Sequence, residues 1–179
     1  MDELRAELTR ARHGALACLL ILITVVGGAA CHAAPPAAVW DGLFDTKEAA
    51  AQAVADALAA QDVAKLRKLT VSGVEFRKNM WPHLPASNPD VGMPVEYVWS
   101  DTDVKSRNGL AQTVASHGGE PLTVATVLFS ESVDHGPFRV HKESTVRART
   151  PQGSVMDVRL FGSMIETPAG WKVFSYIVD

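Results

Sequence analysis

The sequence has few cysteines, and their positions limit what they can do. Of 179 residues only two are cysteine, Cys18 and Cys31. Cys18 lies within an apolar run near the amino terminus, so a chain cleaved after that run keeps Cys31 alone. A single thiol excludes an internal disulfide. In an oxidising compartment such a thiol is a liability unless a modification consumes it.

A long apolar run is also missing. Gly14–Val26 is almost wholly apolar, but a membrane-spanning helix needs about 20 such residues. A flank with Arg5, Arg10 and Arg12 precedes this run and small residues follow it, a pattern typical of a secretory signal peptide. We therefore expect residues 1–30 to form a signal peptide, with an uncleaved membrane anchor as the alternative.

The chain has no strong charge imbalance, since its formal net charge is −3 at pH 7. It has no basic stripe interleaved with aromatic residues, which argues against nucleic acid as a partner. Its domain histidines are scattered, with no helical pair and no second cysteine, so we expect neither a metal site nor another cofactor. These histidines are His83, His117, His135 and His141.

The residues Gly28-Ala29-Ala30-Cys31 resemble the lipobox of bacterial lipoproteins, although Leu is usual where Gly28 stands. The resemblance implies that the Cys31 sulfur carries a diacylglycerol and that Cys31 becomes the new N-terminus. Residues 31–44 then form an Ala/Pro tether, and the protein is exported and anchored to a membrane of the cell envelope. Ordinary signal cleavage nearby is the alternative, and it gives a secreted or periplasmic soluble protein.

Residues 45–179 have the length of one ordinary domain. Capping residues predict helices that begin after Asp45, Asp62 and Ser72. A proline-rich loop follows at residues 82–94, where function and plain variable surface are equally good explanations. The next two predicted elements are a strand, from the alternation of Val95, Tyr97 and Trp99, and a helix from Ser100 to Gly118-Gly119.

Four β-rich runs complete the chain, at about 122–133, 138–149, 154–166 and 171–178. Two connections have the form Thr-Pro-X-Gly, which suits a three-residue hairpin loop. Such loops set Thr150 opposite Ser154 and Thr167 opposite Trp171. This register brings opposite charges face to face in three pairs: Arg147 with Asp157, Glu166 with Lys172, and Arg159 with Asp179.

This register divides the sheet into two faces. The apolar face should pack on the helices: Val140, Val146, Val158, Leu160, Met164, Phe174, Tyr176 and Val178. The mixed face carries Arg139, His141, Glu143, Arg147, Asp157, Arg159, Ser163 and Ser175, with Phe161, Ile165, Val173 and Ile177 among them. Because the mixed face includes apolar residues, we expect partial coverage there, for instance by a second copy in a homodimer.

Helices followed by a long antiparallel meander make an α+β order. The stretches "AVADALAAQDVAKLRKL" (53–69) and "DVRLFGSMIETPAGWKVFSYIVD" (157–179), with this order, resemble the nuclear-transport-factor-two-like superfamily. The resemblance covers roughly residues 49–179. It implies N-terminal helices packed on the concave face of a curved, cone-shaped antiparallel sheet, and a cavity between the two. The superfamily includes ketosteroid isomerases, dehydratases, epoxide hydrolases and many non-catalytic binding or assembly domains.

The candidates for lining this cavity are apolar and aromatic, as small-ligand pockets often are. They are Trp81, Tyr97, Trp99, Leu160, Gly162, Met164, Phe174 and Tyr176. A filled hydrophobic core is the alternative explanation for the same residues. Gly162 is the most suggestive of them, because a glycine inside a strand marks a bend, a bulge or a close approach by another group.

Catalysis requires an acid or a histidine within reach of a substrate, and enzymes of this superfamily typically have an Asp or a His/Asp pair in the pocket. The expected register places the two catalytic candidates, Asp157 and His141, on the mixed face. His141 shares a row there with Ser163 and Ser175, but no acid orients the imidazole. The sequence favours a lipid-anchored binding or assembly module for an apolar ligand. A small isomerase or dehydratase with an acid or His in the cavity is the alternative.

Overall fold

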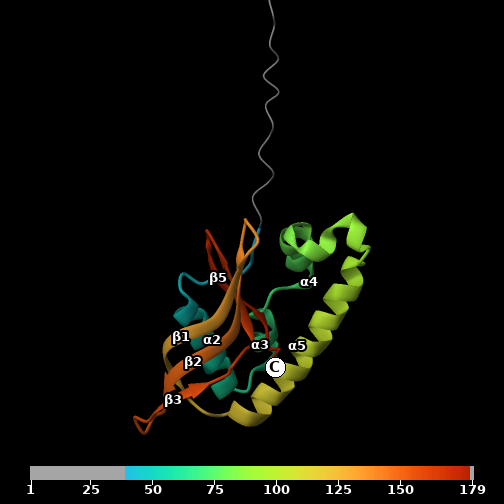
Figure 1. Ribbon diagram of the computed structural model, residues 1–179. Helices are drawn as coiled ribbons and strands as arrows, with labels where there is room; N and C mark the ends of the chain where they lie inside the picture. Colours follow the sequence, from blue (N-terminus) through green and yellow to red (C-terminus); the bar gives the residue numbers. More distant parts are fainter. Residues whose placement is uncertain (1–38, 178–179) are drawn as a thin grey trace, which may run out of the picture. The chain divides into compact units, whose positions relative to one another are not determined.

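The computed structural model describes residues 39–177, which belong to one compact unit. Helices come first and a five-stranded antiparallel sheet follows, so the predicted α+β class is confirmed. In chain order the elements are α2 (Lys47–Ala59), α3 (Val63–Lys68), α4 (Gly73–Glu75), η1 (Phe76–Met80), η2 (Trp81–His83), η3 (Pro85–Ser87), η4 (Pro89–Val91), α5 (Val95–His117), β1 (Thr123–Asp134), β2 (Arg139–Arg149), β3 (Val155–Val158), β4 (Ser163–Thr167) and β5 (Gly170–Ser175) (Figure 1).

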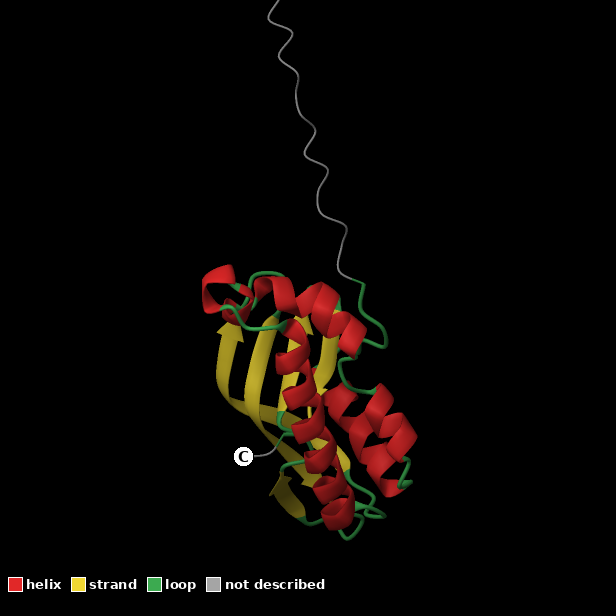
Figure 2. Cartoon of the chain, turned by 90° about the vertical axis from the view of Figure 1, so that its right-hand side faces the viewer, coloured by secondary structure: helices red, strands yellow, loops and turns green. Residues whose placement is uncertain are grey.

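The sheet has the strand order β1-β2-β4-β5, and the short β3 pairs with β2. Helix α2 packs against β1 and β5, while α5 lies across the sheet (Figure 2). The four short helices η1 to η4 and α4 gather near the beginning of α5. No helix within residues 39–177 combines the length and the apolar character needed to span a bilayer.

Two apolar clusters hold these layers together. The larger one joins the inner stripe of α2, including Val54 and Leu58, to Val127, Val146 and Met164 of the sheet. The smaller cluster joins η1 to the other side of the sheet, at residues that include Phe76, Met80, Val140 and Ile165. Fully burying one aliphatic or aromatic side chain contributes roughly 1.5–3 kcal/mol, so each cluster is a substantial part of the stability.

The helix caps agree with the predicted ones at two of three places. Asp62 accepts a hydrogen bond from the backbone N–H of Lys65, and Ser72 forms a capping box with Glu75. The first cap is Thr46 and not Asp45, because the Thr46 hydroxyl accepts the backbone N–H of Ala49. A shift of one residue leaves the helix itself where the pattern predicts it.

The predicted strand at residues 95–99 is wrong, because α5 already begins at Val95. Pro94 sits at the N-cap, where its missing N–H costs nothing. The buried residues of this helix include Gly109 and Leu110, while Tyr97 points to solvent. The alternation of three large side chains over five residues suggests a strand, but the long pattern that follows has helical spacing.

The hairpin register is right at one loop and wrong at the other. Thr150 bonds to Ser154 and Arg147 lies opposite Asp157, as predicted. At the second loop Thr167 pairs with Gly170, one residue earlier than predicted. Glu166 therefore faces Trp171, and Lys172 faces Ile165. The predicted partner of Arg159, Asp179, lies outside the described residues.

The predicted division of the sheet into two faces is also wrong, because β2 reverses its alternation midway. Val140 belongs to the smaller cluster and Val146 to the larger one, although six residues of plain strand would leave both on one side. Between them Glu143 has a φ of 52°, a left-handed conformation that is uncommon for a residue with a side chain. Of the four apolar residues assigned to the mixed face, Phe161, Ile165 and Val173 are fully buried within the chain itself, and Ile177 is partly buried.

The fold begins before residue 45. Trp40 packs against Phe138 with ring centroids 6.4 Å apart, and Phe44 exchanges two backbone hydrogen bonds with Trp171 at 2.7 and 2.8 Å. At least the end of the expected tether, residues 31–44, is thus part of the domain. Cys31 and the expected signal peptide lie outside the described residues.

Candidate functional site

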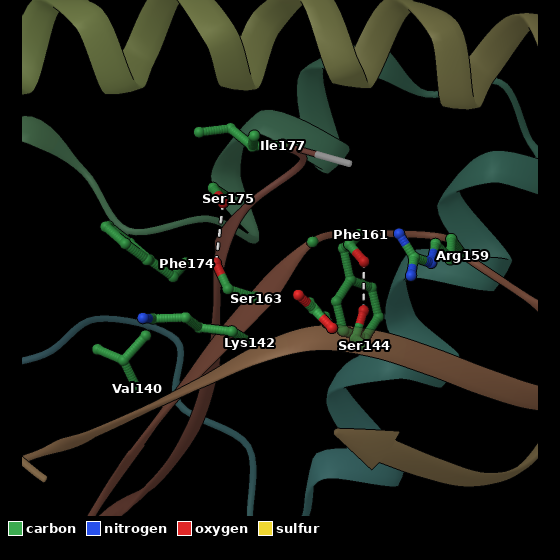
Figure 3. Close-up of a pocket in the computed structure, with 11 residues that line it drawn as sticks. Val140, Lys142, Ser144, Arg159, Phe161, Ser163, Phe174, Ser175 and Ile177 are labelled. Atoms are coloured by element: carbon green, nitrogen blue, oxygen red, sulfur yellow. Dashed lines mark hydrogen bonds between the residues drawn. The ribbon is translucent and has the colours of Figure 1, made fainter. Parts of the chain in front are cut away.

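A cavity of about 230 Å³ lies between β2, the chain that enters β4 and the end of β5. Figure 3 shows the side chains that surround it. The lining residues are Val140, Lys142, Glu143, Ser144, Arg159, Phe161, Gly162, Ser163, Phe174, Ser175 and Ile177. Apolar side chains form much of this wall, and charged groups from β2 and from residue 159 complete it.

Close backbone contacts form one side of the cavity. A Cβ atom at Gly162 would lie 1.5 Å from the Ile177 carbonyl oxygen, so only glycine allows the chain after β5 to pass there. Gly162 also donates its N–H to the Ser175 carbonyl at 3.0 Å. The glycine therefore serves a close approach of two chain segments, one of the explanations that the sequence left open.

Hydroxyl groups connect the strands around the cavity. Ser163 and Ser175 share a hydrogen bond of 2.9 Å, and the Ser144 hydroxyl donates to the Phe161 carbonyl (Figure 3, dashed lines). Both contacts are buried. These serines satisfy one another and the backbone, as buried polar groups must, and so they shape the cavity.

Three charged side chains line the same cavity, namely Lys142, Glu143 and Arg159. Lys142 also reaches Glu131 on β1, with 3.2 Å between the ammonium and the carboxylate. Glu143 makes no ion pair within residues 39–177. A left-handed backbone at such a position costs roughly 1–3 kcal/mol and is found most often at functional sites.

The eight predicted cavity residues are distributed over several places. Gly162 and Phe174 line the cavity, and Trp99 and Tyr176 line a second pocket. Leu160 and Met164 are fully buried in the larger cluster. Trp81 packs on the smaller cluster, and Tyr97 is exposed on α5. The sequence thus identified the strands of the site better than its individual side chains.

Of the two predicted catalytic residues, Asp157 lies on the surface. Both of its carboxylate oxygens accept hydrogen bonds of 2.8 Å from Arg147. These bonds hold the pKa of Asp157 below its ordinary value. The carboxylate is the exposed half of a cross-strand pair, and it lies outside the cavity lining.

His141 is buried on the α2 side of the sheet, away from Ser163 and Ser175. Its ring lies between Phe129 and Trp171, with centroid distances of 4.8 and 4.9 Å. The two ring nitrogens contact the Ser132 hydroxyl at 2.7 Å and the Glu166 carboxylate at 3.0 Å. An acid does orient this imidazole, contrary to the expectation, but the serine beside it is Ser132.

Sequence reasoning predicted only Gly162 and Phe174 of the eleven cavity residues, and it placed Glu143 on the face opposite the expected cavity. The other residues that it missed are Val140, Lys142, Ser144, Arg159, Phe161, Ser163, Ser175 and Ile177. The signal for this error is absent from the local pattern, because nothing in "VHKEST" indicates that Glu143 takes a left-handed conformation. Comparisons with protein-family models, curated proteins and solved structures found no match. The site must therefore be interpreted from its own chemistry.

Proposed function

We propose that this domain is a small-molecule binding module and that the cavity around Phe161, Phe174 and Ile177 is its binding site. The observation that carries the proposal is the composition of that cavity, in which an apolar wall adjoins Lys142, Glu143 and Arg159. Such a combination of apolar surface and few polar groups is typical of ligand sites. The cavity, at about 230 Å³, suits a compact ligand with an apolar body and a polar end.

A fluorescent probe of that chemistry tests the proposal. 1-Anilinonaphthalene-8-sulfonate joins an aromatic body to an anionic group, and we expect saturable binding to the folded chain. Ile177→Trp places a larger side chain in the cavity and should weaken binding by about fivefold or more. The matched control is Val155→Trp, at an exposed position of β3. Near-ultraviolet circular dichroism excludes a loosened state, which also binds this probe. Equal binding by the two variants would contradict the proposal.

The same proposal includes export and a lipid anchor. It is supported by the apolar run Gly14–Val26 and by the single cysteine that remains after it, Cys31. Native mass spectrometry of the protein extracted from its host membranes reads the covalent state of Cys31 and any retained small molecule together. A diacylglyceryl increment on a chain that starts at Cys31 supports the anchor, and a further non-covalent mass supports the binding site. An unmodified Cys31 removes the anchor.

A second candidate is a small isomerase or dehydratase that uses an acid in the cavity. Glu143 favours it, because a carboxylate with no ion pair among the described residues lines the cavity at a strained backbone position. Such a base would take a proton from the carbon beside a carbonyl group and return it. Small ketones incubated in D₂O should then exchange that proton with the wild type and not with Glu143→Gln. If the wild type exchanges no proton, the catalytic candidate is contradicted and the binding module is the remaining proposal.

A further inference from the structure

A second pocket, of about 370 Å³, lies between the helices and is separate from the cavity described above. One side comes from the end of α3 and the segment into α4, and the other from one face of α5. Its lining residues are Arg67, Thr70, Val71, Ser72, Gly73, Trp99, Asp103, Ser106, Arg107, Leu110 and Tyr176. No residue lines both pockets, so the two can bind different molecules.

One part of this pocket's wall is apolar and well fixed. Val71, Leu110 and Tyr176 are buried there. The Tyr176 hydroxyl donates to the Leu66 carbonyl at 3.0 Å, and its burial raises the pKa of the phenol, which stays neutral. Trp99 stands at the edge, with its ring centroid 5.2 Å from that of Phe76. An apolar or aromatic body can therefore rest against a rigid surface.

The charges at the rim are mainly positive. Arg67 and Arg107 line the pocket, and Asp103, the single acid in the lining, is paired with Arg107 at 3.2 Å. Arg67 forms no ion pair within residues 39–177, and the other two cations of α3, Lys65 and Lys68, lie outside the lining. Cations gathered around a partly enclosed apolar surface attract an anion.

We infer that this pocket binds a small organic anion, whose carboxylate or phosphate meets Arg67 and Arg107 and whose apolar body packs against Trp99 and Leu110. A guanidinium group can donate two parallel hydrogen bonds to either kind of anion. Arg107 can turn from the exposed Asp103 toward the ligand at small cost, because such surface pairs contribute about 1 kcal/mol or less. The cavity near Phe174 also has two cations and one carboxylate in its wall, but there Lys142 is paired with Glu131 and the carboxylate of Glu143 has no ion pair within residues 39–177.

The test is a titration of the full-length chain, in detergent micelles if it is anchored, followed by nuclear magnetic resonance. The probes are phenyl phosphate, phenylacetate and, as the neutral control, benzyl alcohol. We expect both anions to shift the indole N–H of Trp99 and the amide of Gly73, and the alcohol to shift neither. A preference between the anions identifies phosphate or carboxylate as the natural group. Equal shifts with all three probes overturn the inference.

Two neighbouring cations on α3 supply the matched variants. Arg67 lines the pocket and Lys68 does not, while both are exposed and carry the same charge. Arg67→Gln should weaken the preferred anion by about tenfold and Lys68→Gln by less than about twofold, since a guanidinium in contact differs from a screened distant charge. If the two variants weaken binding equally, the cations act only through long-range attraction, and the inference of a specific site at Arg67 is overturned. Shifts confined to Phe174 and Ile177 place the anion in the first cavity and overturn it too.

Discussion

At the scale of single residues, Lys172 and Glu75 form a buried ion pair, a contact that carries a large desolvation cost. The two side chains are 3% and 7% exposed, and the ammonium lies 2.8 and 2.9 Å from the carboxylate oxygens. The ammonium also donates to the Asp41 carbonyl at 2.7 Å. Glu75 in turn accepts the backbone N–H groups of Asp41 and Ser72. Every charge taken from water is thus hydrogen-bonded, which such a pair needs to be tolerated.

Removing one partner of this pair should be costly. Lys172→Met leaves the Glu75 carboxylate buried without its counter-charge, so we expect the free energy of unfolding at pH 7 to fall by about 3–5 kcal/mol. Urea denaturation followed by circular dichroism measures it. The double variant Lys172→Met with Glu75→Gln has no buried charge and should recover a large part of the loss. A double variant no more stable than the single one would show that packing, and not charge, causes the loss.

The same pair predicts a dependence on pH. Burial raises the pKa of Glu75, but the hydrogen bonds from Lys172, Ser72 and Asp41 together lower it below the ordinary value. A carboxyl group with a lowered pKa contributes its full stability above its unfolded pKa of about 4.3 and loses it as the pH falls through the folded pKa. The stability difference between wild type and Lys172→Met should therefore shrink from pH 7 to pH 3. If the stability difference between the two chains does not change with pH, Glu75 is not the group that titrates. The other carboxylates are present in both chains, so their contributions cancel in the difference.

At the scale of elements, α5 shows how a glycine can be needed inside a helix. A Cβ atom at Gly109 would lie 1.9 Å from the Tyr176 carbonyl oxygen, a backbone atom that cannot move aside by itself. The nearby Ser106 hydroxyl accepts the Tyr176 N–H at 3.0 Å. Helix α5 and the end of the sheet thus meet at backbone distance, with no side chain between them.

This contact predicts opposite results for two alanine substitutions. Alanine favours a helix over glycine by about 1 kcal/mol, yet Gly109→Ala should destabilise the domain by about 1–3 kcal/mol, because the helix must move away from Tyr176. The control is the exposed neighbour Asn108, where alanine should be neutral or slightly stabilising. Urea midpoints compare the two. A stabilised Gly109→Ala chain would show that α5 sits farther from the sheet end.

The two Thr-Pro-X-Gly loops explain why part of the register was predictable. At the first loop Gly153 takes a φ of 87°, and the three-residue loop forms as predicted. At the second, Gly170 is itself a strand residue, and a Cβ there would lie 2.6 Å from the Phe44 carbonyl oxygen. Local turn chemistry decides the first case. In the second case the deciding contact is with Phe44, which is far from Gly170 in the sequence, so no pattern within the loop could indicate it.

Most of the cavity lining could not be predicted from the sequence, because it too depends on contacts between distant segments. Its strands and Gly162 could be predicted, because alternation and an interrupting glycine are local signals. The reversal at Glu143 and the crossing of Ile177 over Gly162 depend on how β2 and the end of the chain pack together. A single left-handed residue then moved every predicted side chain on one half of β2 to the opposite face, as a shift by one residue does in any strand.

At the scale of the whole molecule, the domain depends on the segment just before its first helix. Phe44 pairs with Trp171 at the edge of the sheet, Asp41 contacts both partners of the buried ion pair, and Trp40 covers Phe138. The Val39 carbonyl accepts the Asn79 side-chain amide at 2.7 Å. A boundary at residue 45, drawn at the predicted cap of the first helix, excludes the residues that make all of these contacts.

Two shortened chains test this dependence. A chain from Ala37 keeps the whole segment, and a chain from Asp45 exposes the Lys172–Glu75 pair and the edge of β5. We expect the second to be less stable by about 3 kcal/mol or more, the range for a disrupted buried pair. Far-ultraviolet circular dichroism in urea measures both without relying on Trp40, which only the longer chain has. Equal midpoints with equal slopes would mean that residues 37–44 only rest on the domain, and the tether would then extend to residue 44 as the sequence predicts.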